Sequence, residues 1–123
     1  MKELRTARAP APTGAYSQGI VAGDFVFVAG QAGKDPLTGL LDSDDIEGQT
    51  AQTLSNIAAI LETAGLGLSD IVKATVHLAD MSLFPRFDAT YRRFFAEPLP
   101  VRTTVGSVMA GILVEIDGVA FSR

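Results

Sequence analysis

Two apolar runs near the start of the chain predict a β-hairpin. Residues 17–22 and 25–30 are separated by the turn pair Gly23-Asp24, and a short turn between two such runs is typical of paired strands. The second run is apolar without a break. We therefore expect it to form a strand that is buried on both faces of its sheet.

Two amphipathic helices follow from apolar positions that recur every three or four residues. The first helix is expected to begin within residues 42–45, where Ser43 or Asp44 could cap its free N–H groups, and to end near Gly65. The second begins near Ser82 and ends before Pro98. The apolar side of the first helix carries Leu54, Ile57, Ala58, Leu61 and Ala64, and that of the second carries Phe84, Phe87, Tyr91, Phe94 and Phe95.

Three further strands are predicted in the second half of the chain. Residues 71–78 alternate between apolar and polar side chains, and residues 101–108 and 113–121 form two more runs joined through Ala110-Gly111 as a hairpin. Two helices covering one face of a sheet make a two-layer α+β domain, here a single domain over residues 1–123. The other face of the sheet would carry Thr75, His77 and Thr103, and an oligomer often covers such a face.

Composition excludes several classes of protein. The chain has 123 residues, no cysteine and one histidine, so it lacks the residues for a disulfide framework, a thiolate zinc site or a multi-histidine metal centre. Its net charge of −4 argues against general nucleic-acid binding. No apolar run is long enough to span a membrane, and the first residues lack an apolar signal core. We therefore expect a soluble cytoplasmic protein.

Arg102 is the most informative candidate for chemistry. It lies inside a predicted strand, on the same face as Thr104. A guanidinium group offers a planar pair of donors that matches a carboxylate. The alternative interpretation is a solvated arginine on an edge strand.

Glu115 is the second candidate, and it shares a strand face with Asp117. A hairpin closing near Ala110-Gly111 would bring Glu115 close to Arg102. The two side chains would then form either a plain salt bridge or a site in which the arginine holds an acidic substrate and the carboxylate manages protons or water.

Tyr16 and Gly30 are weaker candidates for a ligand site. Tyr16 lies in a glycine-flanked segment and could cover a ligand or pack a turn. Gly30 ends an apolar strand, where a glycine permits close approach to the backbone, although an ordinary transition from strand to loop is the favoured explanation when this glycine is taken alone.

Taken together, the motifs resemble the RidA/YjgF family of reactive-intermediate deaminases over nearly the whole chain. No single motif is specific, and their joint order and spacing carry the resemblance. The matching segments are residues 9–10 (AP), 14–19 (GAYSQG), 29–31 (AGQ), 36–39 (PLTG), 52–57 (QTLSNI), 64–66 (AGL), 70–76 (DIVKATV), 89–91 (ATY), 94–95 (FF), 100–102 (PVR) and 114–116 (VEI).

The resemblance implies a chorismate-mutase-like α+β fold with two helices on one face of a mixed sheet. It also implies a homotrimer with clefts between subunits and no cofactor or metal. The implied activity is the hydrolysis of 2-imino and enamino acids, namely 2-aminoacrylate, 2-iminopropanoate and 2-iminobutanoate, to 2-keto acids and ammonia.

The resemblance further implies a role for each matched residue. Arg102 corresponds to the arginine that binds the substrate carboxylate, and Glu115 to the glutamate near the attacking water. Tyr16 corresponds to the aromatic residue that lines the cleft, and Gly30 to the glycine whose backbone contacts the ligand. Thr104 stands where many members have cysteine, and its hydroxyl group could donate a hydrogen bond to the substrate.

Two other functions are compatible with parts of the sequence. The same cleft could sense a small carboxylate without catalysis, because Arg102 fits a binder as well as an enzyme. Some relatives are associated with RNA cleavage or inhibition of translation, but the acidic charge and the absence of a basic strip with aromatic residues argue against that activity here.

Overall fold

The protein, seen in a computed structural model that describes residues 1–122, is built on one six-stranded sheet. The strands lie in the order β1-β2-β3-β6-β4-β5, and only the β4–β5 pair is parallel. The strands are β1 (Lys2–Leu4), β2 (Gly19–Ala22), β3 (Phe25–Gln31), β4 (Ile71–Leu78), β5 (Val101–Gly106) and β6 (Val114–Phe121), and the helices are α1 (Ile46–Glu62), α2 (Phe84–Arg92) and the 3-10 turns η1 (Leu68–Asp70) and η2 (Met81–Leu83).

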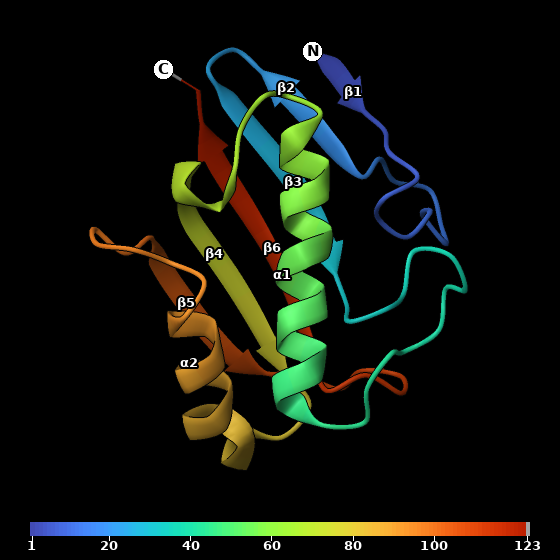
Figure 1. Cartoon of the computed structure of the whole chain (residues 1–123), viewed down its shortest axis with the longest axis vertical. Coiled ribbons are helices and arrows are strands. Elements are labelled where there is room, and N and C mark those ends of the chain that lie inside the picture. The colour runs from blue at the N-terminus through green and yellow to red at the C-terminus, as the bar shows by residue number, and fades with distance from the viewer. Residues whose placement is uncertain (123) are drawn as a thin grey trace.

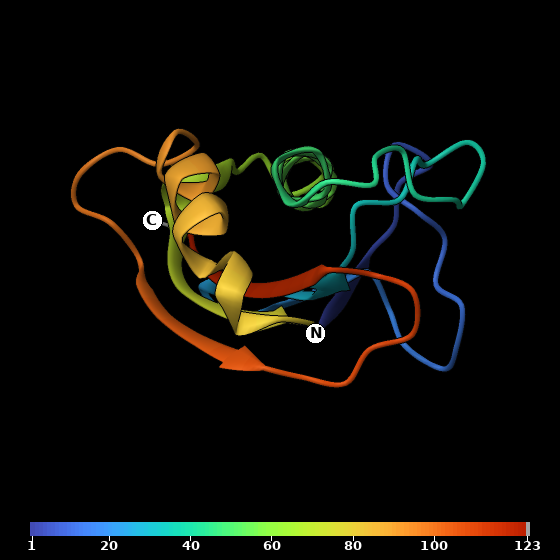
Figure 2. The ribbon, with the colours of Figure 1, turned by 90° about the horizontal axis from the view of Figure 1, so that it is seen from below.

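Both α-helices cover the same face of this sheet, so the two-layer α+β arrangement with a mixed sheet is confirmed (Figures 1 and 2). The core lies between the layers, where Leu54, Ile57 and Leu61 of α1 are each at most 1% exposed. The residue that caps α1 is Asp45, not Ser43 or Asp44, because its carboxylate accepts a hydrogen bond from Gly48 N at 2.7 Å. The sheet face opposite the helices is called the open face below.

The hairpin of β2 and β3 forms as predicted, with Gly23 at a φ of +59° in its turn. The prediction that the second strand is buried on both faces is wrong. Val26 and Val28 face the helices, but Phe25 and Phe27 lie on the open face and are 43% and 47% exposed. Aromatic side chains on the open face thus explain why this strand lacks a polar residue in every second position.

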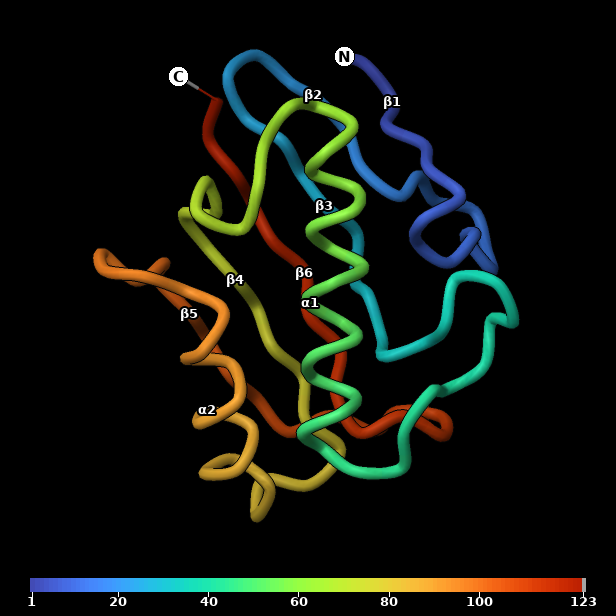
Figure 3. Tube along the Cα trace, viewed as in Figure 1, coloured from blue at the N-terminus to red at the C-terminus, as the bar shows by residue number. Residues whose placement is uncertain are grey.

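The predicted hairpin between the last two strands is also wrong. Strand β5 pairs with β4 in parallel, while β6 runs antiparallel between β4 and β3 (Figure 3). Helix α2 is the connection between β4 and β5, and two strands joined through a helix generally pair in parallel. Strand β4 therefore separates the two strands that were expected to be neighbours.

Within residues 1–122, no helix is long and apolar enough to cross a membrane.

Candidate functional site

The candidate residues fall into two groups on opposite faces of the sheet. Tyr16, Gly30 and Glu115 line one pocket of about 120 Å³. Arg102 lines another pocket, of about 260 Å³, beside α2. We call these the Glu115 pocket and the Arg102 pocket.

Gly30 is the reason that Glu115 fits in its pocket. The pairing of β3 with β6 shifts register between Val28 and Gln31, which places Gly30 directly against the Glu115 side chain. A Cβ atom at Gly30 would lie 2.8 Å from Glu115 Oε2 and 2.9 Å from its carboxyl carbon. The glycine thus provides the space that the carboxylate occupies on the open face.

Tyr16 forms one wall of the same pocket and is 48% exposed. Its hydroxyl oxygen accepts a hydrogen bond from Thr13 N at 3.2 Å, which fixes the ring against its own loop. Lys34 and Gln31 also line this pocket, and sequence reasoning missed both. Gln31 stands directly after Gly30 in the AGQ segment, whereas Lys34 follows in a loop and gives no sequence signal.

Arg102 is held by helix α2. Its Nη1 donates a 2.8 Å hydrogen bond to Asp88 Oδ1, and the two side chains are 20% and 31% exposed. Its guanidinium carbon lies 4.7 Å from the ring centre of Tyr91, with Phe87 at 5.4 Å and Phe84 at 5.5 Å. The alternative interpretation of a solvated arginine is therefore wrong, since this side chain packs on three aromatic rings with a carboxylate at one side.

Two buried hydroxyl groups, one on β5 and one on α2, lack hydrogen-bond partners. The hydroxyl groups of Thr104 and Tyr91 make no hydrogen bond within residues 1–122. Burial raises the pKa of the Tyr91 hydroxyl above its usual range, and the charge of Arg102 opposes that rise. An unpaired buried hydroxyl group costs about 1–3 kcal/mol. Thr104 is not among the residues that line the Arg102 pocket, and its role in substrate binding stays a prediction.

Arg102 and Glu115 do not face each other in one chain. Arg102 pairs in register with Ala74 on one side of β4, whereas Glu115 pairs with His77 on the other side of that strand. Their side chains also leave the sheet on opposite faces. Neither an Arg102–Glu115 salt bridge nor a shared site forms within the chain, because the hairpin that would align them does not exist.

His77 lies on the open face, as its place in the alternating strand predicts. Its Nδ1 is 2.7 Å from Ser107 Oγ, so a side-chain hydrogen bond links β4 to the residue that follows β5. His77 is therefore engaged with a neighbouring hydroxyl group at the edge of the open face.

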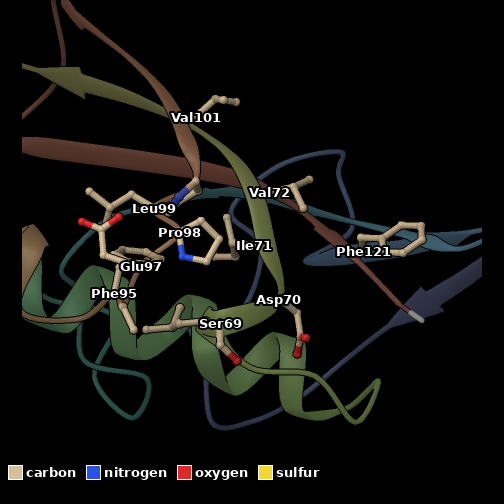
Figure 4. Close-up of a pocket in the computed structure, with 13 residues that line it drawn as sticks. Ser69, Asp70, Ile71, Val72, Phe95, Glu97, Pro98, Leu99, Val101 and Phe121 are labelled. Atoms are coloured by element: carbon tan, nitrogen blue, oxygen red, sulfur yellow. The ribbon is translucent and has the colours of Figure 1, made fainter.

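A further pocket, of about 270 Å³, lies where the start of β4 meets the loop before β5 (Figure 4). Its walls are mainly apolar and include Pro98, Leu99 and Phe121. Asp70, one of its few polar residues, accepts a hydrogen bond from Gly67 N. The pocket contains none of the predicted site residues. Among residues 1–122, acidic and histidine side chains form no cluster that could hold a metal ion.

Comparison with known proteins finds relatives of one family along the whole chain. The family model for Endoribonuclease L-PSP matches residues 6–122. A RutC family protein from Pyrococcus horikoshii is 45% identical, with both chains covered in full. A 2-iminobutanoate/2-iminopropanoate deaminase from Salmonella typhimurium is 39% identical, with 99% of this chain and 98% of the relative covered.

A solved structure extends the similarity to the fold. Escherichia coli TdcF with bound serine matches with a TM-score of 0.93 and 34% identity, covering all of both chains. The chain therefore belongs to the Endoribonuclease L-PSP family, which is the RidA/YjgF family that its motifs resemble.

Proposed function

We propose that the protein hydrolyses short 2-imino acids to 2-keto acids and ammonia. The observation that carries the proposal is the position of Arg102. Its guanidinium group packs on three aromatic rings and lines an open pocket. An arginine with free donors in such a place suits a small carboxylate. The deaminase name of the Salmonella relative and the serine bound to E. coli TdcF support a ligand of the α-amino acid type.

The reaction needs two functions from this chain. Arg102 holds the substrate carboxylate and so orients the imine carbon. Glu115 accepts a proton from a water molecule that adds to this carbon, and the imine nitrogen takes up a proton, which gives a neutral carbinolamine. The carbinolamine nitrogen then takes up a second proton while the hydroxyl group gives up its own, so that the C–N bond breaks, ammonia leaves and the carbonyl group of the 2-keto acid forms. One water molecule is consumed for each imine.

These two functions must come from different copies of the chain, because Arg102 and Glu115 lie on opposite faces of one sheet. The open face supplies an apolar surface for such a contact. Phe25 and Phe27 of β3 are 43% and 47% exposed on this face, and Val101 and Val105 of β5 are 66% and 39% exposed. Large exposed apolar side chains on one face of a sheet are typical of contact surfaces. We propose that three copies pack through the open face, with the edge strand β5 of one copy beside the Glu115 pocket of the next. Each cleft would then join Arg102 and Thr104 of one copy to Tyr16, Gly30 and Glu115 of the next.

The homotrimer is expected to persist on dilution, because obligate interfaces bury a large apolar area. Sedimentation equilibrium at micromolar concentration should give three times the mass of the chain. A monomer mass under these conditions would contradict both the trimer and the shared cleft.

Replacement of Gly30 with alanine is expected to reduce imine hydrolysis. The added methyl group would lie 2.8 Å from Glu115 Oε2 and push the carboxylate aside. A displacement of this kind should cost roughly ten- to a hundredfold in rate. Gly67→Ala is the matched control, because a Cβ atom there meets nothing within 4 Å. Equal rates for the two variants would show that the position of Glu115 is unimportant.

The function itself is tested with imines generated in situ by an amino-acid oxidase. The decay rate of each imine is compared with and without protein, and the series of side chains gives the substrate range. Decay above the buffer rate supports the enzyme. Binding of 2-keto acids without any acceleration would instead favour a carboxylate sensor, and salt-dependent RNA cleavage by a nuclease-free preparation would favour an RNA-acting protein.

A further inference from the structure

Arg102 already has a carboxylate partner before any ligand binds. A guanidinium group has five N–H donors, and within residues 1–122 Arg102 uses one of its nitrogens, Nη1, for a single hydrogen bond to Asp88. The remaining donors make no hydrogen bond in this part of the chain, and both Arg102 and Asp88 line the Arg102 pocket. The pocket thus combines free donors with a fixed negative charge.

Asp88 is not the only group that positions the guanidinium. The rings of Phe84, Phe87 and Tyr91 all lie within 5.5 Å of the guanidinium carbon. Stacking on aromatic rings restricts the plane of an arginine side chain. The charge of Asp88 therefore has a consequence beyond structure, because it lowers the positive potential that an incoming anion meets.

Another arginine, Arg86 of α2, shows a different arrangement. Arg86 gives two hydrogen bonds of 2.8 Å to both carboxylate oxygens of Glu47, at an exposed position. That pair is bidentate and lies outside the Arg102 pocket. The Arg102–Asp88 pair, by contrast, is joined by one bond and leaves donors available.

We propose that Asp88 is a specificity-determining residue that weakens the hold of Arg102 on carboxylates. The Asp88 carboxylate competes with the substrate carboxylate for Arg102, because it neutralises part of the guanidinium charge and occupies one of its donors. This inference rests on the proposed function, in which substrate and product share a carboxylate group. A site that bound carboxylates too tightly would be blocked by its own 2-keto acid product and by other small carboxylates.

The direct test is the binding of 2-oxobutanoate, a product of the proposed reaction, by isothermal titration calorimetry. Asp88→Asn keeps an oxygen that accepts the bond from Nη1 but removes the negative charge. We expect this variant to bind 2-oxobutanoate roughly three- to tenfold more tightly than the unmodified protein. The gain should shrink at high salt, because salt screens partly exposed charges.

Glu47→Gln is the matched control. Hydrogen bonds from Arg86 lower the pKa of Glu47 to about 2, so this substitution also removes one negative charge beside an arginine, in this case Arg86 of α2. It lies outside the Arg102 pocket and should leave the affinity for 2-oxobutanoate unchanged. In turnover assays, Asp88→Asn should lower KM for the imine and increase inhibition by added 2-oxobutanoate, whereas Glu47→Gln should change neither.

The outcomes separate this inference from the proposed function. If the unmodified protein binds 2-oxobutanoate in an Arg102-dependent manner and Asp88→Asn binds it equally or less tightly, the role of Asp88 is overturned and the function stands. An equal gain in Glu47→Gln would also overturn it, since the effect would then come from net charge. If neither the unmodified protein nor Asp88→Asn binds 2-oxobutanoate or hydrolyses imines, both proposals fail together.

Discussion

Arg102→Ala is expected to lower the rate of 2-imino acid hydrolysis at least about tenfold. Each charge-assisted hydrogen bond to a substrate carboxylate is worth about 1.5–3 kcal/mol, and about 1.4 kcal/mol corresponds to a factor of ten in rate. Losing both bonds of a bidentate contact also removes the orientation of the imine carbon, so the measured loss should exceed this minimum. The measurement is the decay rate of oxidase-generated imines.

The same variant should remain folded, although its stability will fall. Removal of the side chain leaves Asp88 without its partner and exposes parts of three rings. Asp88 is already 31% exposed, so water can solvate its carboxylate. We expect a melting temperature lower by a few degrees, corresponding to about 1–2 kcal/mol. Circular dichroism on the preparation used for kinetics would check this.

Arg102→Lys provides a second variant that keeps the charge beside Asp88. Lysine is a point charge and does not reproduce the planar pair of donors, so we expect stability close to that of the unmodified protein with little recovery of activity. Normal kinetics in Arg102→Ala would show that this residue is not the substrate anchor. Full recovery in Arg102→Lys would show that charge alone is sufficient.

Periodicity identified most elements correctly because each layer leaves a local pattern in the sequence. The alternation over residues 71–78 appears as strand β4, with Ala74, Val76 and Leu78 buried against the helices. The stripe in the first helix appears as α1, with Leu54, Ile57 and Leu61 in the core. These patterns depend on neighbours a few residues away, which the sequence shows directly.

The position of β5 depended on longer-range pairing and was predicted wrongly. The loop around Ala110-Gly111 resembles a hairpin turn, but it connects two strands that do not pair. The order strand, helix, strand over β4, α2 and β5 was the better signal, since a helical connection favours parallel pairing. Strand β6 then fits between β3 and β4, where both of its edges are paired.

The resemblance named each candidate site residue, and their roles stay predictions, but the contacts among them were not predicted. The sequence places the aromatic residues of α2 on the apolar side of that helix. The structure shows that three of these rings also pack against the Arg102 guanidinium. The partner of Arg102 is Asp88, which depends on how α2 is rotated against β5. Such a rotation is fixed by packing between distant segments and leaves no periodic signal in the sequence.

Glu115→Gln is expected to lower imine hydrolysis by about a hundredfold or more, while Asp117→Asn should change it less than about twofold. The two carboxylates share the open face of β6, but only Glu115 lines the pocket with Tyr16 and Gly30. Asp117 lies opposite Thr75 and is not among the residues that line this pocket. A general base contributes roughly a hundred- to ten-thousandfold to a rate when it reaches the reacting proton.

Glutamine keeps the size of Glu115 and the contact with Gly30, but it cannot take a proton from water. Because Glu115 makes no ion pair within residues 1–122, the substitution should leave the melting temperature nearly unchanged, and so should Asp117→Asn. The deciding measurement is kcat for each variant on the same imine, since loss of a proton acceptor lowers kcat and a weakened binding contact raises KM. If Glu115→Gln keeps full activity while Asp117→Asn loses it, the carboxylate that positions water is Asp117, and the pocket formed by Tyr16 and Gly30 is not where the chemistry occurs.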